Sequence, residues 1–248
     1  MKVSLFITCL VDQLFPRVGV KTVELLRRCG VEVRFNAAQT CCGQPAFNTG
    51  YRREAMRVAA GTLALLEAEL EEADYVVVPS GSCTAMIRNS YPELFASDPS
   101  ARARAELVGG RVFELSEFLV NVLGVGDVGA SYEGGVTYHD SCHLLRDLGV
   151  SAEPRRLIGA VRGAEFVEME GADACCGFGG TFSVKYPEIS AAITDDKIKQ
   201  VERSGAGALV ACDSGCLMQM SAALSRAGSK VRCMHLAELL GEREAQTT

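Results

Sequence analysis

Two adjacent cysteines followed by a glycine occur twice in this chain of 248 residues, as Cys41-Cys42-Gly43 and as Cys175-Cys176-Gly177. Single cysteines accompany each triplet at matched distances. They are Cys9 and Cys83 in the first half and Cys142 and Cys216 in the second. Corresponding members of the two sets lie 133 or 134 residues apart. Eight of the eleven cysteines therefore form two matched sets of four, which indicates an internal duplication.

The pattern of apolar residues predicts the same order of strands and helices in both halves. We expect strands at 3–8, 31–35, 75–78 and 111–115, and again at 136–140, 165–169, 208–211 and 231–234. We expect helices at 18–28, 52–70, 116–123, 153–161, 187–203 and 235–240. Alternating strands and helices are typical of parallel sheets with right-handed crossovers. The predicted fold is α/β, with two pseudo-symmetric small Rossmann-like units.

A glycine-rich stretch at 124–135 has no regular apolar period and is the best candidate for a domain boundary. We therefore predict a first cysteine-rich domain over 1–125 and a second over 135–248. Within the first, Ser97-Asp98-Pro99-Ser100 begins a polar segment that contains Arg102 and Arg104 and leads to Arg111. We interpret this segment as a solvated connector rather than a phosphate site.

The cysteines of each set follow the first, second and third predicted strands of their half. In parallel sheets, ligands bind beyond the carboxyl ends of the strands. Residues that are distant in sequence would thus meet at one edge. The predicted metal ligands are Cys9, Cys41, Cys42, Cys83, Cys142, Cys175, Cys176, Cys212 and Cys216.

Thiolates are soft ligands that suit iron–sulfur clusters, zinc and Cu(I). The long gaps between these cysteines differ from the short spacings of structural zinc sites. Adjacent cysteines suit a cluster in which two sulfurs reach different irons. Gly43 and Gly177 would let the backbone adopt a positive φ and pass close to the cluster. We expect an iron–sulfur cluster, with zinc, a redox disulfide or buried thiols as alternatives.

The second half carries an additional cysteine, Cys212, at the position that Pro79 occupies in the first. A fifth thiolate could bridge irons or leave one iron open to substrate. We therefore predict Cys212, Cys216 and His143 as catalytic residues. His139 and His143 could donate a hydrogen bond to a cluster or move protons, and a structural imidazole is the alternative for each.

The net charge of −6 and a pI near 5.2 argue against nucleic-acid binding. No run approaches ~18 apolar residues, so we expect no membrane span. The start of the chain resembles residues 136–142 more than a signal peptide, and we expect a cytoplasmic protein. No phosphate-binding loop or dinucleotide fingerprint is present in the sequence. A role in oxidation would therefore require partner proteins.

The doubled pattern resembles the cysteine-rich CCG domain family, and the match covers nearly the whole chain. That family includes the B component of heterodisulfide reductase and the iron–sulfur subunits of glycolate oxidase and anaerobic glycerol-3-phosphate dehydrogenase. In heterodisulfide reductase B each domain binds a noncubane [4Fe–4S] cluster through five cysteines. The usual extra cysteine of the first site is Ser80 here, and the second site closes as C-x₃-C.

A pair of CCG domains without a ferredoxin module looks most like the LutA (YkgE) family of lactate utilization proteins. The resemblance implies an iron–sulfur electron-transfer subunit of an L-lactate oxidising complex, with one or two clusters of [4Fe–4S] type. It also implies a ferredoxin-type LutB-like partner and a LutC-like partner. The other hypotheses are a thiol–disulfide reductase subunit and a zinc-stabilised scaffold.

Overall fold

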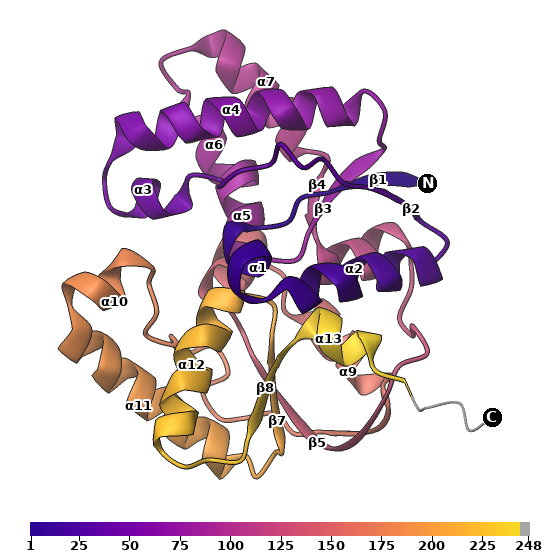
Figure 1. The fold of residues 1–248 in the computed structure, drawn as a ribbon, viewed down its shortest axis with the longest axis vertical. Coiled ribbons are helices and arrows are strands. Elements are labelled where there is room, and N and C mark those ends of the chain that lie inside the picture. The colour runs from indigo at the N-terminus through magenta and orange to yellow at the C-terminus, as the bar shows by residue number, and fades with distance from the viewer. Residues whose placement is uncertain (244–248) are drawn as a thin grey trace.

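A computed structural model, which describes residues 1–243, contains two four-stranded parallel sheets with the same strand order (Figure 1). The first sheet has the order β2-β1-β3-β4 and the second the order β6-β5-β7-β8. The strands of the first are β1 (Lys2–Leu5), β2 (Glu32–Arg34), β3 (Tyr75–Val78) and β4 (Val112–Glu114). Those of the second are β5 (Ser131–His139), β6 (Arg162–Phe166), β7 (Ala208–Ala211) and β8 (Arg232–His235). The predicted α/β fold with two similar parallel units is confirmed.

Short and long helices connect the strands. In the first half they are α1 (Cys9–Leu14), α2 (Pro16–Arg28), α3 (Gln44–Asn48), α4 (Arg52–Leu70), α5 (Gly81–Ala85), α6 (Tyr91–Leu94), α7 (Pro99–Gly109) and α8 (Leu115–Glu117). In the second half they are α9 (Ala152–Gly159), α10 (Thr181–Lys185), α11 (Pro187–Arg203), α12 (Ser214–Arg226) and α13 (Leu236–Gly241). Three segments have π-helical geometry: η1 (Met86–Ser90), η2 (Phe118–Val122) and η3 (His143–Asp147).

The inner faces of the two sheets share one hydrophobic core. Its buried members include Val3 and Leu5 of β1 together with Val136 and Tyr138 of β5. Helices α2 and α13, one from each half, pack side by side in the middle of the molecule (Figure 1). The Arg28 guanidinium, at the end of α2, donates to the backbone oxygens of Val128 (3.0 Å) and Leu240 (3.1 Å). The two halves are therefore joined by a continuous apolar layer.

Strand residues alternate between this shared core and a separate outer core. Val77 of β3 belongs to the shared core, whereas its neighbours Val76 and Val78 pack in an outer cluster beneath α4. In β7, Val210 faces the shared core and Leu209 faces a second outer cluster beneath α11 and α12. This alternation follows from the two-residue period of a strand. It explains why β3 and β7 are continuous apolar runs, since both of their faces are buried.

Most strand boundaries differ from the predicted ones by a few residues, and the differences at β5 and β6 concern how the second sheet pairs. β5 begins at Ser131, inside the glycine-rich stretch, and β6 occupies 162–166 rather than 165–169. The long β5 pairs with β6 from Ser131↔Arg162 to Val136↔Phe166, with a register shift between Ser131 and Gly134. Backbone pairing thus extends the two strands over residues that are mostly polar or glycine, which a search for apolar residues does not assign to a strand.

The predicted polar connector after Ser97 is wrong, because residues 99–109 form helix α7. The Asp98 carboxylate caps this helix by accepting from Ser100 N and Ala101 N, each at 3.0 Å. Pro99 occupies the first turn, where proline is favoured. The Asp-Pro pair therefore begins a helix rather than a connector. The arginines of this region serve helices, since Arg102 pairs with Glu106 (2.9 Å) and Arg104 pairs with Glu67 of α4.

Arg111, the third arginine of this region, caps the end of α4. Its guanidinium donates to the backbone oxygens of Asp74 (2.8 Å), Leu70 (3.1 Å) and Ala73. Carbonyls at the end of a helix lack intrahelical donors, so a cation stabilises them. Among the helices of residues 1–243, none combines the length and the apolar character that crossing a bilayer requires.

We predict that Asp98→Ala lowers the free energy of unfolding by about 1 kcal/mol, because two N–H groups of α7 lose their acceptor. Urea denaturation measures the change. Ser97→Ala is the matched control, since Ser97 is an exposed neighbour. An equal loss of stability in both variants would contradict the capping role.

Candidate functional site

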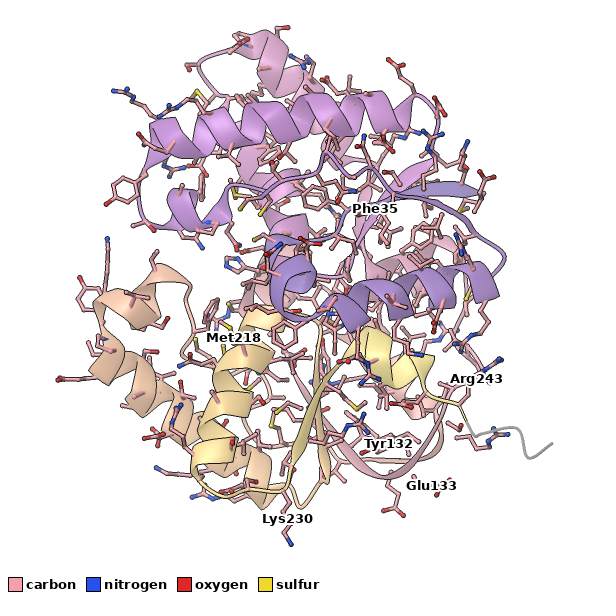
Figure 2. All side chains as sticks on the ribbon, in the orientation of Figure 1. Phe35, Tyr132, Glu133, Met218, Lys230 and Arg243 are labelled. Carbon is pink, nitrogen blue, oxygen red and sulfur yellow. The ribbon has the colours of Figure 1, made fainter. Side chains whose placement is uncertain are left out.

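One cavity lies between the two halves, at the carboxyl ends of both sheets. It has a volume of about 210 Å³, several times the ~30 Å³ that one water occupies. All eight matched cysteines line it: Cys9, Cys41, Cys42, Cys83, Cys142, Cys175, Cys176 and Cys216. In Figure 2, sulfur atoms lie between α3 above and the labelled Met218 below. The duplication thus produces one cysteine-lined cavity rather than two separate sites.

The first set comes from three connections of the first sheet. Cys9 begins α1, Cys41 and Cys42 lie in the loop after β2, and Cys83 lies in α5. The sulfurs of Cys42 and Cys83 are 3.2 Å apart, and those of Cys9 and Cys41 are 4.0 Å apart. All four thiols are free. Their mutual distances suit donors that converge on one group.

The second set repeats this arrangement. Cys142 immediately precedes η3, Cys175 and Cys176 follow β6, and Cys216 lies in α12. Ligand atoms of Cys176 and Cys216 lie within 4.8 Å of each other and of a ring nitrogen of His139. This half therefore offers an imidazole in addition to its four thiols.

Each triplet glycine holds its loop in a left-handed conformation and donates to a cysteine. Gly43 has φ 90° and Gly177 has φ 87°, where residues with a side chain are strained. The N–H of Gly43 points at Cys41 Sγ (3.3 Å), and the N–H of Gly177 points at Cys175 Sγ (3.3 Å). Such hydrogen bonds favour the thiolate form of the sulfur that accepts them.

Burial and crowding oppose the charged form of several thiols. Burial raises the pKa of Cys142 above its usual value. Hydrogen bonding to Cys41 and Cys83, followed by burial, raises the pKa of Cys42. Several thiolates could not share this cavity without positive charge to offset their repulsion. The donors therefore fit a cationic metal group, because metal binding deprotonates thiols and supplies that charge.

Cys212 is not among the residues that line the cavity. It follows the buried strand that leads into α12, has no exposed surface and belongs to the shared core. The Tyr138 hydroxyl lies 3.5 Å from its sulfur. The C-x₃-C spacing predicted Cys212 and Cys216 as neighbouring ligands, but the structure brings only Cys216 to the cavity. The chain changes from strand to helix between these two cysteines. The Cys212 side chain therefore points into the shared core, whereas the Cys216 side chain points to the cavity.

The predicted catalytic His143 lines the cavity and is partly exposed. Its Nδ1 lies 2.5 Å from Asp147 Oδ2, one turn further along η3. This contact fixes the orientation of the ring at the edge of the cavity. A histidine held by a carboxylate can carry a proton between solvent and the cavity.

A cross-half hydrogen bond that the sequence did not reveal lies at the cavity. Asp213 accepts from Ser80 Oγ (2.7 Å) and Ser82 Oγ (2.7 Å), and its oxygens also lie 3.2–3.3 Å from Ser82 N. Ser80 and Asp213 each stand three residues before the closing cysteine of their half, Cys83 or Cys216. An alignment of the two halves on those cysteines places Ser80 opposite Asp213, and this correspondence could have indicated their contact.

Lys197 of α11 is a second residue that sequence reasoning missed. It is 1% exposed, and its ammonium donates to the backbone oxygens of Gly171 (2.7 Å) and Ala172 (3.0 Å). Burial lowers the pKa of Lys197 to about 8, and the nearby Cys176 and Asp140 act in the opposite direction. The second half thus contains a buried positive group close to its thiols.

Comparisons with known proteins agree with the duplicated site. The family model "Cysteine-rich domain" (CCG) matches residues 3–88 and again residues 136–221. Lactate utilization protein A of Geobacillus kaustophilus is 49% identical over 243 residues, which cover 98% of this chain and 100% of that protein. The chain belongs to this family of paired CCG proteins. Lactate utilization protein A of Bacillus subtilis is 48% identical, again over 98% of this chain and 100% of the relative.

We predict that Gly177→Ala destabilises the protein more than Gly43→Ala. Both variants place a side chain at positive φ, which costs about 1–2 kcal/mol. A Cβ at Gly177 would also lie 2.6 Å from Ser190 O and closer still to Thr194 Oγ1. At Gly43 the nearest atom is Ala55 O at 3.3 Å. Urea denaturation of both variants measures the difference, and equal losses would contradict the steric argument.

We predict that Asp213→Ala lowers the free energy of unfolding by about 1.5–3 kcal/mol, because buried donors of the other half lose a charged acceptor. The matched control is Ser214→Ala, since the buried Ser214 hydroxyl has no hydrogen-bond partner among the described residues. Chemical denaturation of both variants is the measurement. Unchanged stability of the Asp213→Ala protein would show that the cross-half contact contributes nothing.

Proposed function

We propose that this chain is a cytoplasmic iron–sulfur electron-transfer subunit that takes part in oxidising L-lactate to pyruvate. The observation that carries the proposal is the convergence of eight thiols, four from each half, on one cavity. The choice of lactate as the substrate rests on the curated relatives. They share 48–49% of their residues with this chain over their full length and are named lactate utilization protein A.

The donor set supports iron–sulfur chemistry over a mononuclear zinc site. Zinc takes four ligands, usually delivered by short spacings. Here eight thiols surround one cavity of about 210 Å³, and each half delivers an adjacent pair. Soft thiolates in such number suit clusters that contain several irons. Once bound, a cluster of this kind would supply one-electron storage and transfer.

Each part of the site has a distinct role in the proposal. Cys9, Cys41, Cys42 and Cys83 would hold one cluster, and Cys142, Cys175, Cys176 and Cys216 a second. The N–H groups of Gly43 and Gly177 donate to Cys41 and Cys175, the first cysteine of each adjacent pair. Hydrogen bonds to ligand sulfurs influence the reduction potential of a cluster. The apolar walls beneath Cys42 and Cys176 limit access of water to the thiolates.

His143 serves as the proton-carrying group in this proposal. Its position at the cavity and its contact with Asp147 would let it hold a proton close to the second set of cysteines. Removal of two electrons from lactate also releases protons, and a positioned imidazole can accept one as a general base. The electrons would pass to a ferredoxin-type LutB-like partner, with a LutC-like protein completing the complex.

We predict that protein purified without oxygen carries about eight irons and eight acid-labile sulfides per chain, as two four-iron clusters require. Cys9→Ser and Cys216→Ser should each lower the iron content toward half, because each removes a ligand from one set. Metal analysis together with EPR spectra of each redox state is the measurement. Zinc as the only stoichiometric metal would support the scaffold hypothesis instead.

Two further cysteine variants are matched controls for the ligand assignment. Cys212→Ser should keep the full iron content, since the Cys212 side chain lies in the shared core, with its sulfur 3.5 Å from the Tyr138 hydroxyl. Cys29→Ser should do the same, since Cys29 ends α2 at a distance from the site. Loss of iron from the Cys212→Ser protein would restore the sequence-based assignment of a fifth thiolate ligand.

A further inference from the structure

His139, at the end of β5, is buried. The side chain is 1% exposed, and neither Nδ1 nor Nε2 has a partner of full hydrogen-bond geometry among the residues that the structure describes, although the Ala172 backbone lies close enough to oppose the lowering of the ring's pKa by burial. Buried polar atoms in native proteins are nearly always satisfied, so two unsatisfied ring nitrogens require an explanation. An imidazole nitrogen whose partner is a metal ion would provide one.

Two thiols lie close to His139. A ring nitrogen of His139 and the sulfurs of Cys176 and Cys216 lie within 4.8 Å of one another, and all three residues are buried. Metal–nitrogen bonds of about 2.0–2.1 Å and metal–sulfur bonds of about 2.3 Å place the donors of one tetrahedral ion about 3.5–3.8 Å apart, which is within this limit. The three side chains come from a strand end, a loop and a helix. The tertiary structure therefore directs them to one point.

The first half has no equivalent of this imidazole. Residues 3–9 align with residues 136–142, and Phe6 stands where His139 stands in the second half. Phe6 is also buried, in an apolar cluster with Cys42 and Cys83. A phenyl ring fills this position in the same fold, so packing alone does not require a histidine. The histidine is an addition specific to the second half.

We propose that His139 is a nitrogen ligand of the metal centre in the second half, together with Cys176 and Cys216. This inference rests on the proposed function, because the metal would be an iron of the second cluster. Neither Cys212 nor His139 is among the residues that line the cavity, but only His139 forms with Cys176 and Cys216 a group of donor atoms within 4.8 Å of one another. His139 would therefore be the fifth donor beside the four thiols of the second set. The two halves would then hold chemically different centres.

The expected consequence is a higher reduction potential for the second centre than a thiolate in the place of His139 would give. A neutral imidazole places less negative charge on iron than a thiolate does, and histidine ligation raises the potential of iron–sulfur centres. The buried ammonium of Lys197 acts in the same direction.

The test is pulsed EPR on anaerobically prepared protein that contains ¹⁵N-labelled histidine, with ⁵⁷Fe Mössbauer spectra for redox states without an EPR signal. The chain has three histidines, so variants identify the source of any nitrogen coupling. His139→Phe reproduces the first half at this position. His139→Cys replaces the nitrogen by a thiolate. His143→Phe is the control, because His143 is the other histidine at the cavity.

We expect a nitrogen coupling of the size of a coordinated imidazole in the wild-type and His143→Phe proteins, and its loss in both His139 variants. His139→Cys should keep its iron and sulfide and show a lower reduction potential for one centre. Full iron content without such a coupling, or a coupling that persists in His139→Phe, would overturn the proposal. A wild-type protein that binds no iron would instead overturn the proposed function, and this ligand with it.

Discussion

The packing of two parallel sheets against one shared apolar layer is the constraint on which the site depends. Helices α2 and α13 lie together in that layer, and β1 and β5 contribute side chains to it from opposite sides. Because the carboxyl ends of parallel strands lie at one edge of a sheet, this packing brings both cysteine-bearing edges to one cavity. Separate sheets would present two half-sites instead. The Asp213 contact with Ser80 and Ser82 then fixes the closing helices α5 and α12 relative to each other.

The site brings together many thiols, four of them buried, while the buried Lys197 ammonium supplies positive charge close to the second set. Burial and neighbouring sulfurs make thiolates unfavourable there, as the raised pKa values of Cys42 and Cys142 reflect. The glycine N–H groups favour thiolates only at Cys41 and Cys175. The folded chain thus offers a binding site for a cationic metal group, whose positive charge the deprotonated cysteines would balance. Folding positions the donors, and metal binding would complete their charge balance.

The two halves keep the same fold but have diverged around the cavity. Phe6 corresponds to His139, Ser80 to Asp213 and Pro79 to Cys212. Each change adds a polar or metal-binding group to the second half, where the buried Lys197 also lies. Burying such groups is costly unless they find partners, and Lys197 and Asp213 have hydrogen bonds that satisfy them. His139 differs from them, because its ring nitrogens lack a partner of full hydrogen-bond geometry among the described residues while one of them lies within 4.8 Å of two cysteine sulfurs.

The sequence by itself determined the duplication, the parallel α/β fold and the two matched cysteine sets, because strand periodicity and residue spacing are local properties. It failed where a signal was ambiguous, as at Asp98-Pro99, which begins a helix, and at residues 162–164, which join a strand through backbone pairing. Only the tertiary structure decided that the sets share one cavity, that Cys212 faces the core and that His139 meets Cys176 and Cys216. Those facts depend on side-chain direction across separate elements, which spacing along a chain does not specify.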